Sequence, residues 1–297
     1  MSRLTPAHAG RSRISSTLLS IGSVRRCLPL FVSATPRTPL RVLCVMAFDA
    51  LHQLRYSKPL PVETHRVLAA LLDFGACMNA IFDDKEYSRK ELELTRQILD
   101  EAGLHSMVDE VLRRLSAVEG KRPSPFGPLG DPRQFHDVRS YREAVARLWL
   151  GTVAATAAGS RCLEEGVLAT YGDDVLEILF RIVMQCQIID DVLDYSRDAS
   201  AGLPSFLTAS ASLPDAIERT RQASCEYADH RDLPRSGDVF PLRMALGTAS
   251  ICAKLVILLR RWRCACLKSA KSPRPRLPSE QNLQNDVDFQ QARSSYR

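Results

Sequence analysis

Three aspartates in one short segment, Asp190, Asp191 and Asp194, have the residue types and the spacing to bind a divalent cation. Isoleucine and leucine recur around them at helical spacing, and no glycine or proline interrupts residues 174–197, so we expect a buried helix here. Residues four apart lie on one face of a helix, which places the side chains of Asp190 and Asp194 one above the other. Gln187 lies one turn earlier on the same helix.

Carboxylates crowded into one turn need compensation. Like charges at helical spacing weaken a helix by a few tenths of a kcal/mol per pair, and the apolar neighbours of these aspartates offer little solvation. Mg²⁺ relieves such repulsion well, because it binds a few carboxylate oxygens, keeps several waters and is completed by substrate phosphates. The three aspartates therefore predict that this segment binds Mg²⁺ together with a phosphate-containing ligand. A solvated helix end, with Asp194 and Asp198 leading into a loop, is the alternative that the sequence leaves open.

A second acidic group is predicted at the end of a helix from Pro61 to Asp84. Its members are Asn79, Asp83, Asp84 and Glu86. If the helix continues, three of them, Asn79, Asp83 and Glu86, share one face. Lys85, Arg89 and Lys90 follow closely and could bind a phosphate. An acidic run followed by a basic run is also typical of a solvated helix end.

Further helices are expected along the rest of the chain. One or two should occupy Lys90 to Val118, and a loop rich in proline and glycine should follow from Glu119 to Pro132. Two more helices are expected at Pro214 to Tyr227 and at about Val239 to Trp262. Few aromatic residues and no series of β-branched runs argue against strands, so the fold class predicted is all-α, a single helical bundle.

A helix predicted from Tyr141 to Leu168 has a middle of small residues, from Gly151 to Gly159. Such a face either permits close helix packing or leaves room for a bulky apolar ligand. Arg142 and Arg147 near the start of this helix could face the aspartates or the solvent.

Charge and cysteine usage restrict the function classes. The net charge of +6 comes from the two ends: residues 1–48 contribute +7 and residues 261–297 contribute +5, which leaves the middle at −6. The basic pI therefore gives no reason to expect a nucleic-acid-binding core. The nine scattered cysteines, without a CxxC pair, are typical of reduced intracellular thiols, and we expect a cytoplasmic protein.

The two ends of the chain differ from its middle. Residues 1–47, rich in Arg and Ser and free of acids, match an organelle transit peptide. A disordered extension, or a translation start at Met46, are the competing interpretations. We expect residues 48–263 to form the all-helical domain and residues 264–297 to be a disordered tail. No uninterrupted apolar run reaches the length of a membrane span.

The segment Gln187-Ile-Ile-Asp190-Asp191-Val-Leu-Asp194 resembles the second aspartate-rich motif, QxxDDxxD, of the class I isoprenoid synthases. The context is similar to the squalene and phytoene synthase branch of that superfamily, of the trans-prenyltransferase type, over roughly Pro61 to Arg263. The similar features are Tyr141-Arg-Glu-Ala-Val-Ala, the alanine-rich helix, the Gly-Leu-Pro stretch and the closing Pro241-Leu-Arg-Met-Ala-Leu.

The resemblance implies a helical bundle in which two facing acidic motifs hold Mg²⁺ and the diphosphate of a prenyl substrate, with the prenyl tail in an apolar cavity. By resemblance the catalytic residues and second metal site are Asp190, Asp191 and Asp194. The first metal site would be Asp83, Asp84 and Glu86. Substrate-binding candidates are Gln187, Arg89, Lys90, Arg142 and Arg147. The first motif departs from the family, since Asn79 stands where one branch has aspartate and Tyr87 stands where the other has it.

The function expected is therefore a Mg²⁺-dependent prenyl diphosphate synthase or transferase of isoprenoid biosynthesis. A helical lipid-binding or scaffold protein that has lost catalysis is one alternative, and Asn79 favours it. A metal-dependent phosphohydrolase built from His105, the doublet His136-Asp137 and Asp190 is another. The partners expected are a prenyl diphosphate and no nucleic acid. Peripheral membrane contact and the oligomeric state are left open.

Overall fold

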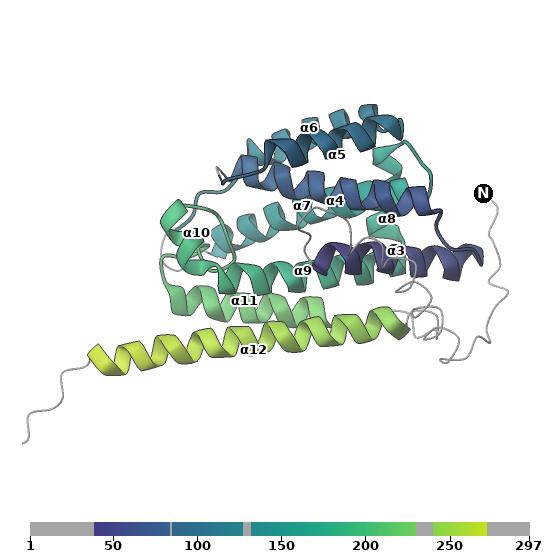
Figure 1. The fold of residues 1–297 in the computed structure, drawn as a ribbon. Helices are drawn as coiled ribbons and strands as arrows, with labels where there is room; N and C mark the ends of the chain where they lie inside the picture. The colour runs from purple at the N-terminus through teal and green to yellow at the C-terminus, as the bar shows by residue number, and fades with distance from the viewer. Residues whose placement is uncertain (1–38, 84, 127–131, 230–239, 272–297) are drawn as a thin grey trace, which may run out of the picture. The chain divides into compact units, whose positions relative to one another are not determined.

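The computed structural model describes residues 39–83, 85–126, 132–229 and 240–271, and within these ranges it contains helices and no strands. The all-α prediction is confirmed. In chain order (Figure 1) the helices are α3 (Pro39–Tyr56), α4 (Val62–Phe82), α5 (Arg89–Glu101), α6 (His105–Glu119), α7 (Pro132–Ala157), α8 (Leu163–Gly172), α9 (Asp174–Leu193), α10 (Tyr195–Ala201), α11 (Leu213–Ala228) and α12 (Phe240–Lys271).

The chain divides into two compact units, residues 1–258 and residues 259–297. In the first unit α7 is the central helix, because it packs against α3, α4, α6, α8 and α9. Figure 1 shows α5 and α6 above α4 and α7, and α9 and α11 below them. The described part of the second unit is the end of α12, from Leu259 to Lys271.

The helix predicted from Tyr141 to Leu168 is divided, so that prediction was wrong. α7 ends at Ala157, where the amide of Ser160 donates to the carbonyl of Ala155 at 2.9 Å and the amide of Gly159 donates to that of Thr156 at 3.0 Å. Gly159 has φ of +72°, and this pair of bonds around a left-handed glycine is a Schellman motif that ends a helix. The chain then returns as α8.

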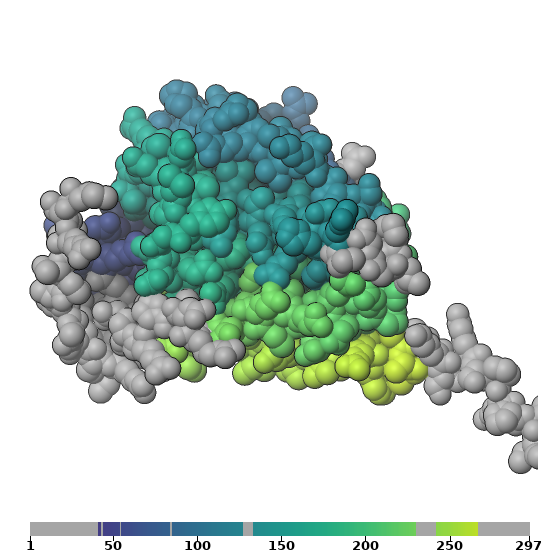
Figure 2. All heavy atoms as spheres, turned by 180° about the vertical axis from the view of Figure 1, so that it is seen from behind, coloured from purple at the N-terminus to yellow at the C-terminus, as the bar shows by residue number. Residues whose placement is uncertain are grey.

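The small residues of α7 serve helix packing. A Cβ added to Gly166 of α8 would lie 2.1 Å from the carbonyl oxygen of Gly151, so the two backbones touch. Figure 2, the view from behind, shows α7 and α8 in teal in direct contact. Of the two alternatives for the face between Gly151 and Gly159, the structure shows close helix packing.

Both predicted domain boundaries fall inside helices. α3 begins at Pro39, nine residues before the predicted start, and its Val42 and Val45 are buried. The acid-free composition obscured an apolar stripe that packs against α4. α12 likewise continues to Lys271, beyond the predicted end at Arg263. The transit-peptide and tail predictions for residues 1–38 and 272–297 lie outside the described residues.

Among the described residues, two helices are long and apolar enough to cross a membrane by length and composition: Val62–Phe82, which is α4, and Leu242–Cys266 within α12. The requirement for an uninterrupted apolar run missed the second, because Arg243 and Lys254 interrupt it. The two differ in burial: 56% of the apolar window in α4 is buried, against 22% of the window in α12.

Candidate functional site

Both acidic segments lie at the C-terminal ends of helices. Asp83 follows the last residue of α4, and Asp190, Asp191 and Asp194 lie in or directly after the last turn of α9. A helix C-terminus carries partial negative charge, so acids there are unfavourable unless cations lie near. Neither helix has a basic residue in its own last turn. The compensating cations must therefore come from other parts of the fold.

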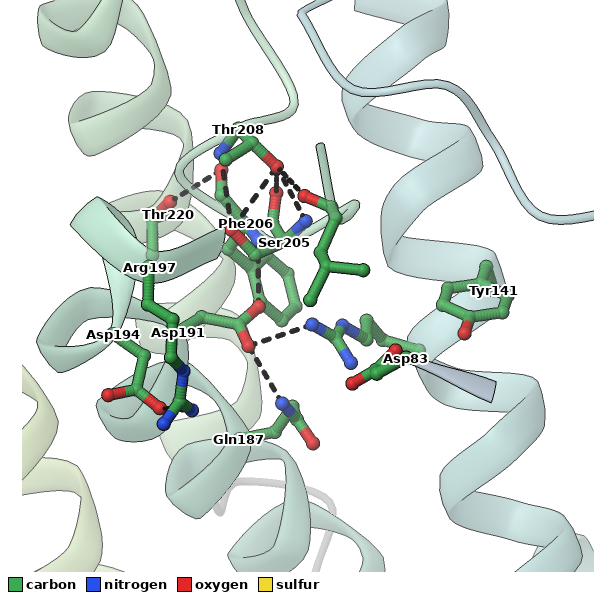
Figure 3. A network of polar contacts seen from close by, with 12 residues as sticks. Asp83, Tyr141, Gln187, Asp191, Asp194, Arg197, Ser205, Phe206, Thr208 and Thr220 are labelled. Atoms are coloured by element: carbon green, nitrogen blue, oxygen red, sulfur yellow. Dashed lines mark hydrogen bonds and ion pairs between the residues drawn. The ribbon is translucent and has the colours of Figure 1, made fainter. Parts of the chain in front are cut away.

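Asp191 is buried and accepts three hydrogen bonds. Arg142 of α7 donates from Nη2 at 3.0 Å, Gln187 donates from Nε2 at 2.8 Å, and the backbone amide of Phe206 donates at 2.8 Å (Figure 3). Burial raises the pKa of this carboxyl to about 6, although the three donors act to lower it. With these bonds made, Asp191 has little capacity left for another ligand.

The amide of Phe206 belongs to a buried strap, residues 203–210, that crosses the end of α9. Thr208 fixes the strap, since its hydroxyl accepts from the amide of Ser205 at 2.7 Å and donates to the carbonyl of Leu203 at 2.7 Å. Sequence reasoning missed this contact. The sequence signal for it is weak. Gly202 ends α10 with φ of +65°, and the segment after it contains the apolar residues Leu203, Phe206 and Leu207.

Arg142 is under the influence of both acidic segments. Its guanidinium donates to Asp191, and the charge of Asp83 acts on it as well. Burial acts to lower the pKa of Arg142. The net effect is nevertheless a raised pKa, because the electrostatic effects of nearby groups are larger, namely those of Asp191, Tyr141, Asp198 and Asp83. The sequence left Arg142 open between the aspartates and the solvent, and the structure shows it at Asp191.

Asp83 is held by two cations close to it in the fold. Lys85 donates from Nζ at 2.7 Å, and Arg122 pairs with the other carboxylate oxygen while also donating to the carbonyl of Phe82 at 3.0 Å. These two cations lower the pKa of Asp83, against the effect of burial. Lys85 also acts to lower the pKa of Asp190 and of Asp198, so it faces the α9 side as well.

Asp190, Asp194 and Asp198 follow each other at intervals of four residues. The side chain of Asp190 is exposed, yet partial desolvation and then the charge of Asp194 raise its pKa. Asp194 forms an ion pair with Arg197 (Figure 3). Asp198 is buried, and burial raises its pKa. We call Asp83, Asp190, Asp191, Asp194 and Asp198, together with Lys85, Arg122, Arg142 and Arg197, the charged cluster.

The predicted cofactor, Mg²⁺, fits part of this donor set. Asp190 supplies exposed carboxylate oxygens, and its repulsion with Asp194 is what a cation would relieve. Asp191 fits poorly as a direct ligand because three donors occupy it. Among the described residues no group of three His, Cys, Asp or Glu side chains is arranged to hold a metal by itself. The donor set therefore fits a metal ion whose remaining coordination positions a phosphate ligand would fill.

Other predicted residues of the first motif do not join the cluster. α4 ends at Phe82, so Glu86 does not continue its face and is exposed, and Asn79 is exposed as well. Arg89 and Lys90 are exposed in the first turn of α5, where Arg89 pairs with Glu93 at 3.1 Å. Asp84 lies outside the described residues.

Arg147 has a different environment from Arg142. It donates to the carbonyl of Thr170 at 2.6 Å and to Glu177 at 3.2 Å, and its guanidinium lies 3.6 Å from the ring centroid of Phe180. Glu177 precedes Asp190 by thirteen residues, about 20 Å along α9. Arg147 therefore joins α7 to the start of α9 and lies away from the charged cluster.

The residues of the phosphohydrolase alternative are not gathered. His136 and Asp137 are 77% and 63% exposed on α7, with 3.7 Å between Nδ1 and Oδ1, and His105 is exposed at the start of α6. No observation in the described structure favours that reading.

No protein-family model, no curated protein and no solved structure matches this chain.

Proposed function

We propose that the chain binds a prenyl diphosphate together with Mg²⁺ at the charged cluster and ionises it, as a synthase or transferase resembling the class I isoprenoid synthases. The observation that carries the proposal is the closeness of the two acidic helix ends. Arg142, which donates to Asp191, is also under the charge of Asp83, and Lys85, which pairs with Asp83, acts on Asp190 and Asp198.

The interleaved charges suit a diphosphate. Lys85, Arg122, Arg142 and Arg197 supply cationic donors, and the guanidinium groups match phosphate oxygens geometrically. When these cations turn to a diphosphate, oxygens of Asp83 and Asp194 become free to bind a metal. Magnesium, when bound, supplies Lewis-acid assistance to the departure of the diphosphate. Asp191 acts as a positioning residue that holds Arg142 and Gln187 in place.

A lipid-binding protein of the same fold, without catalysis, is the second candidate, and a specific observation favours it. Asp83 already has two cationic partners, and exposed Asn79 occupies the place of the leading aspartate of the first motif. In that case the cluster would bind the diphosphate group without turnover.

Incubation of the full chain with Mg²⁺ and a panel of prenyl diphosphates separates the candidates. The synthase predicts release of pyrophosphate and new lipid products, both lost in Asp190→Asn. The exposed Asp137→Asn is the matched control, since it removes the same charge from α7 outside the cluster. Binding without product favours the lipid-binding protein, and absence of binding contradicts both.

A further inference from the structure

Helix α12 has two apolar faces, of which the fold uses one. In the first unit, Leu242, Leu246, Ala253 and Ile257 are buried and fix the helix to the bundle. The opposite face exposes four large apolar side chains: Met244 at 57%, Ile251 at 60%, Leu255 at 55% and Leu258 at 53%.

These four residues, which we call the outer stripe, form one continuous strip. They follow each other at intervals of seven, four and three residues, the spacing of a single helix face. Single exposed leucines are ordinary on protein surfaces, but a contiguous strip marks a surface that contacts something apolar. The described end of α12 in the second unit also exposes large apolar side chains, Leu259 and Trp262.

The charge on α12 discriminates between partners. The helix carries seven basic residues and no acidic residue: Arg243, Lys254, Arg260, Arg261, Arg263, Lys268 and Lys271. Pairing α12 with α12 of a second copy would bring only like charges together in either direction. A surface of anionic lipid headgroups above acyl chains complements the outer stripe and the two basic residues of α12 in the first unit, Arg243 and Lys254.

The buried face decides how the helix can meet a bilayer. The segment Leu242–Cys266 is long and apolar enough by length and composition to span a bilayer. Spanning would require the buried leucines of α12 to leave the bundle, exposing the apolar surfaces of both. A helix that keeps one face on the protein and offers the other to lipid lies in the plane of the interface.

We propose that the outer stripe of α12 docks the protein on anionic membrane surfaces, with the part of α12 in the first unit, residues 240–258, lying parallel to the bilayer. Met244, Ile251, Leu255 and Leu258 enter the boundary between headgroups and acyl chains, and Lys254 at the edge of the stripe contacts the headgroups. The proposal does not depend on diphosphate binding at the charged cluster.

Co-sedimentation of the full chain with phosphatidylcholine vesicles, with and without phosphatidylserine, tests the proposal. We expect binding that requires phosphatidylserine and weakens with salt. The double variant Ile251→Glu and Leu255→Glu should bind the vesicles at least about tenfold more weakly than the wild type, because it places two acids in the stripe. Lys254→Ser should weaken binding about fivefold, the loss of one cation near the surface.

A matched control carries the same charge change elsewhere. Val62→Glu with Leu168→Glu replaces two residues that are 73% and 63% exposed on α4 and α8, and its vesicle binding should equal that of the wild type. Circular dichroism verifies that both double variants remain folded, which their exposed positions favour.

Three results would overturn the proposal. One is absence of vesicle binding by the wild type, and another is an equal loss in the control and in the α12 variant. The third is a wild-type dimer in light scattering that the α12 variant converts to a monomer while vesicle binding is unchanged, which would assign the stripe to a second copy.

Discussion

The ends of α4 and α9 carry similar acids but hold them differently. On α9, Asp191 is buried and bonded to an arginine from α7, a glutamine one turn earlier and the amide of a distant strap. On α4, Asp83 is partly buried and held by Lys85, two residues away, and by Arg122. The α9 side is thus tied into the tertiary structure, whereas the α4 side depends more on side chains near its surface.

The difference suggests a division of labour between the two ends. A buried carboxylate that accepts from three donors fixes the geometry of its neighbours. A carboxylate whose cationic partners are partly exposed can exchange those partners for a ligand. The comparison predicts large effects on stability from the α9 side and small ones from the α4 side.

Asp191→Ala should have the largest effect. It leaves the buried guanidinium of Arg142 without its carboxylate and the amide of Phe206 without an acceptor, which costs about 3 to 5 kcal/mol of the free energy of unfolding. Urea denaturation measures the loss. Asp137→Ala, at an exposed position, should change stability by less than about 0.5 kcal/mol. A similar small change in both variants would show that Asp191 is not tied into the fold as described.

The pH dependence of stability should differ between wild type and Asp191→Asn. The pKa of Asp191 is raised from 3.8 to about 6, so the folded protein holds a proton that the unfolded chain releases across this window. The contribution of Asp191 to the free energy of unfolding is therefore largest below pH 4. It declines by on the order of 3 kcal/mol as the pH rises toward 6. Denaturation curves of both proteins from pH 4 to pH 7 give the difference. A constant difference, or one that grows with pH, contradicts the assignment.

Asp83→Ala should have a moderate effect. Loss of its pairs with Lys85 and Arg122 should lower the free energy of unfolding by about 1 kcal/mol, because the ion pairs are only partly shielded from water. It should also weaken binding of Mg²⁺ and pyrophosphate less than Asp190→Ala does, measured by titration calorimetry. Equal losses, or a reversed order, would show that the α4 side is the stronger metal site.

Glu86→Gln should have the smallest effect. Glu86 is exposed beyond the end of α4, so its substitution should change stability by less than about 0.5 kcal/mol and leave ligand binding unchanged. A loss of binding as large as that of Asp190→Ala would restore Glu86 to the first metal site.

Local patterns predicted much of the fold. The periodic spacing of apolar residues was enough for α4, α9, α11 and α12, and for the position of the aspartates in the last turn of α9. The break between α7 and α8 was missed because glycine and alanine occur both within helices and at their ends. Only the hydrogen bonds around Gly159 distinguish the two.

The partners in the cluster could not be predicted from spacing alone. Arg142 and Arg147 were equivalent in the sequence, yet one contacts Asp191 and the other packs on Phe180. Which arginine reaches the aspartates depends on how α7 crosses α9, a tertiary property. The strap that donates from Phe206 lies in an irregular segment, and such long-range bonds leave no periodic signal.

The melting temperature of the full chain with Mg²⁺ and inorganic pyrophosphate tests the central claim most directly. Binding at the charged cluster stabilises the folded protein by mass action, by about 2.7 kcal/mol at a ligand concentration one hundred times the Kd. We predict a rise that requires both ligands together, is lost in Asp190→Ala and is retained in Asp137→Ala. No rise at millimolar concentrations, or an equal rise in both variants, would contradict a diphosphate site at the meeting of α4 and α9.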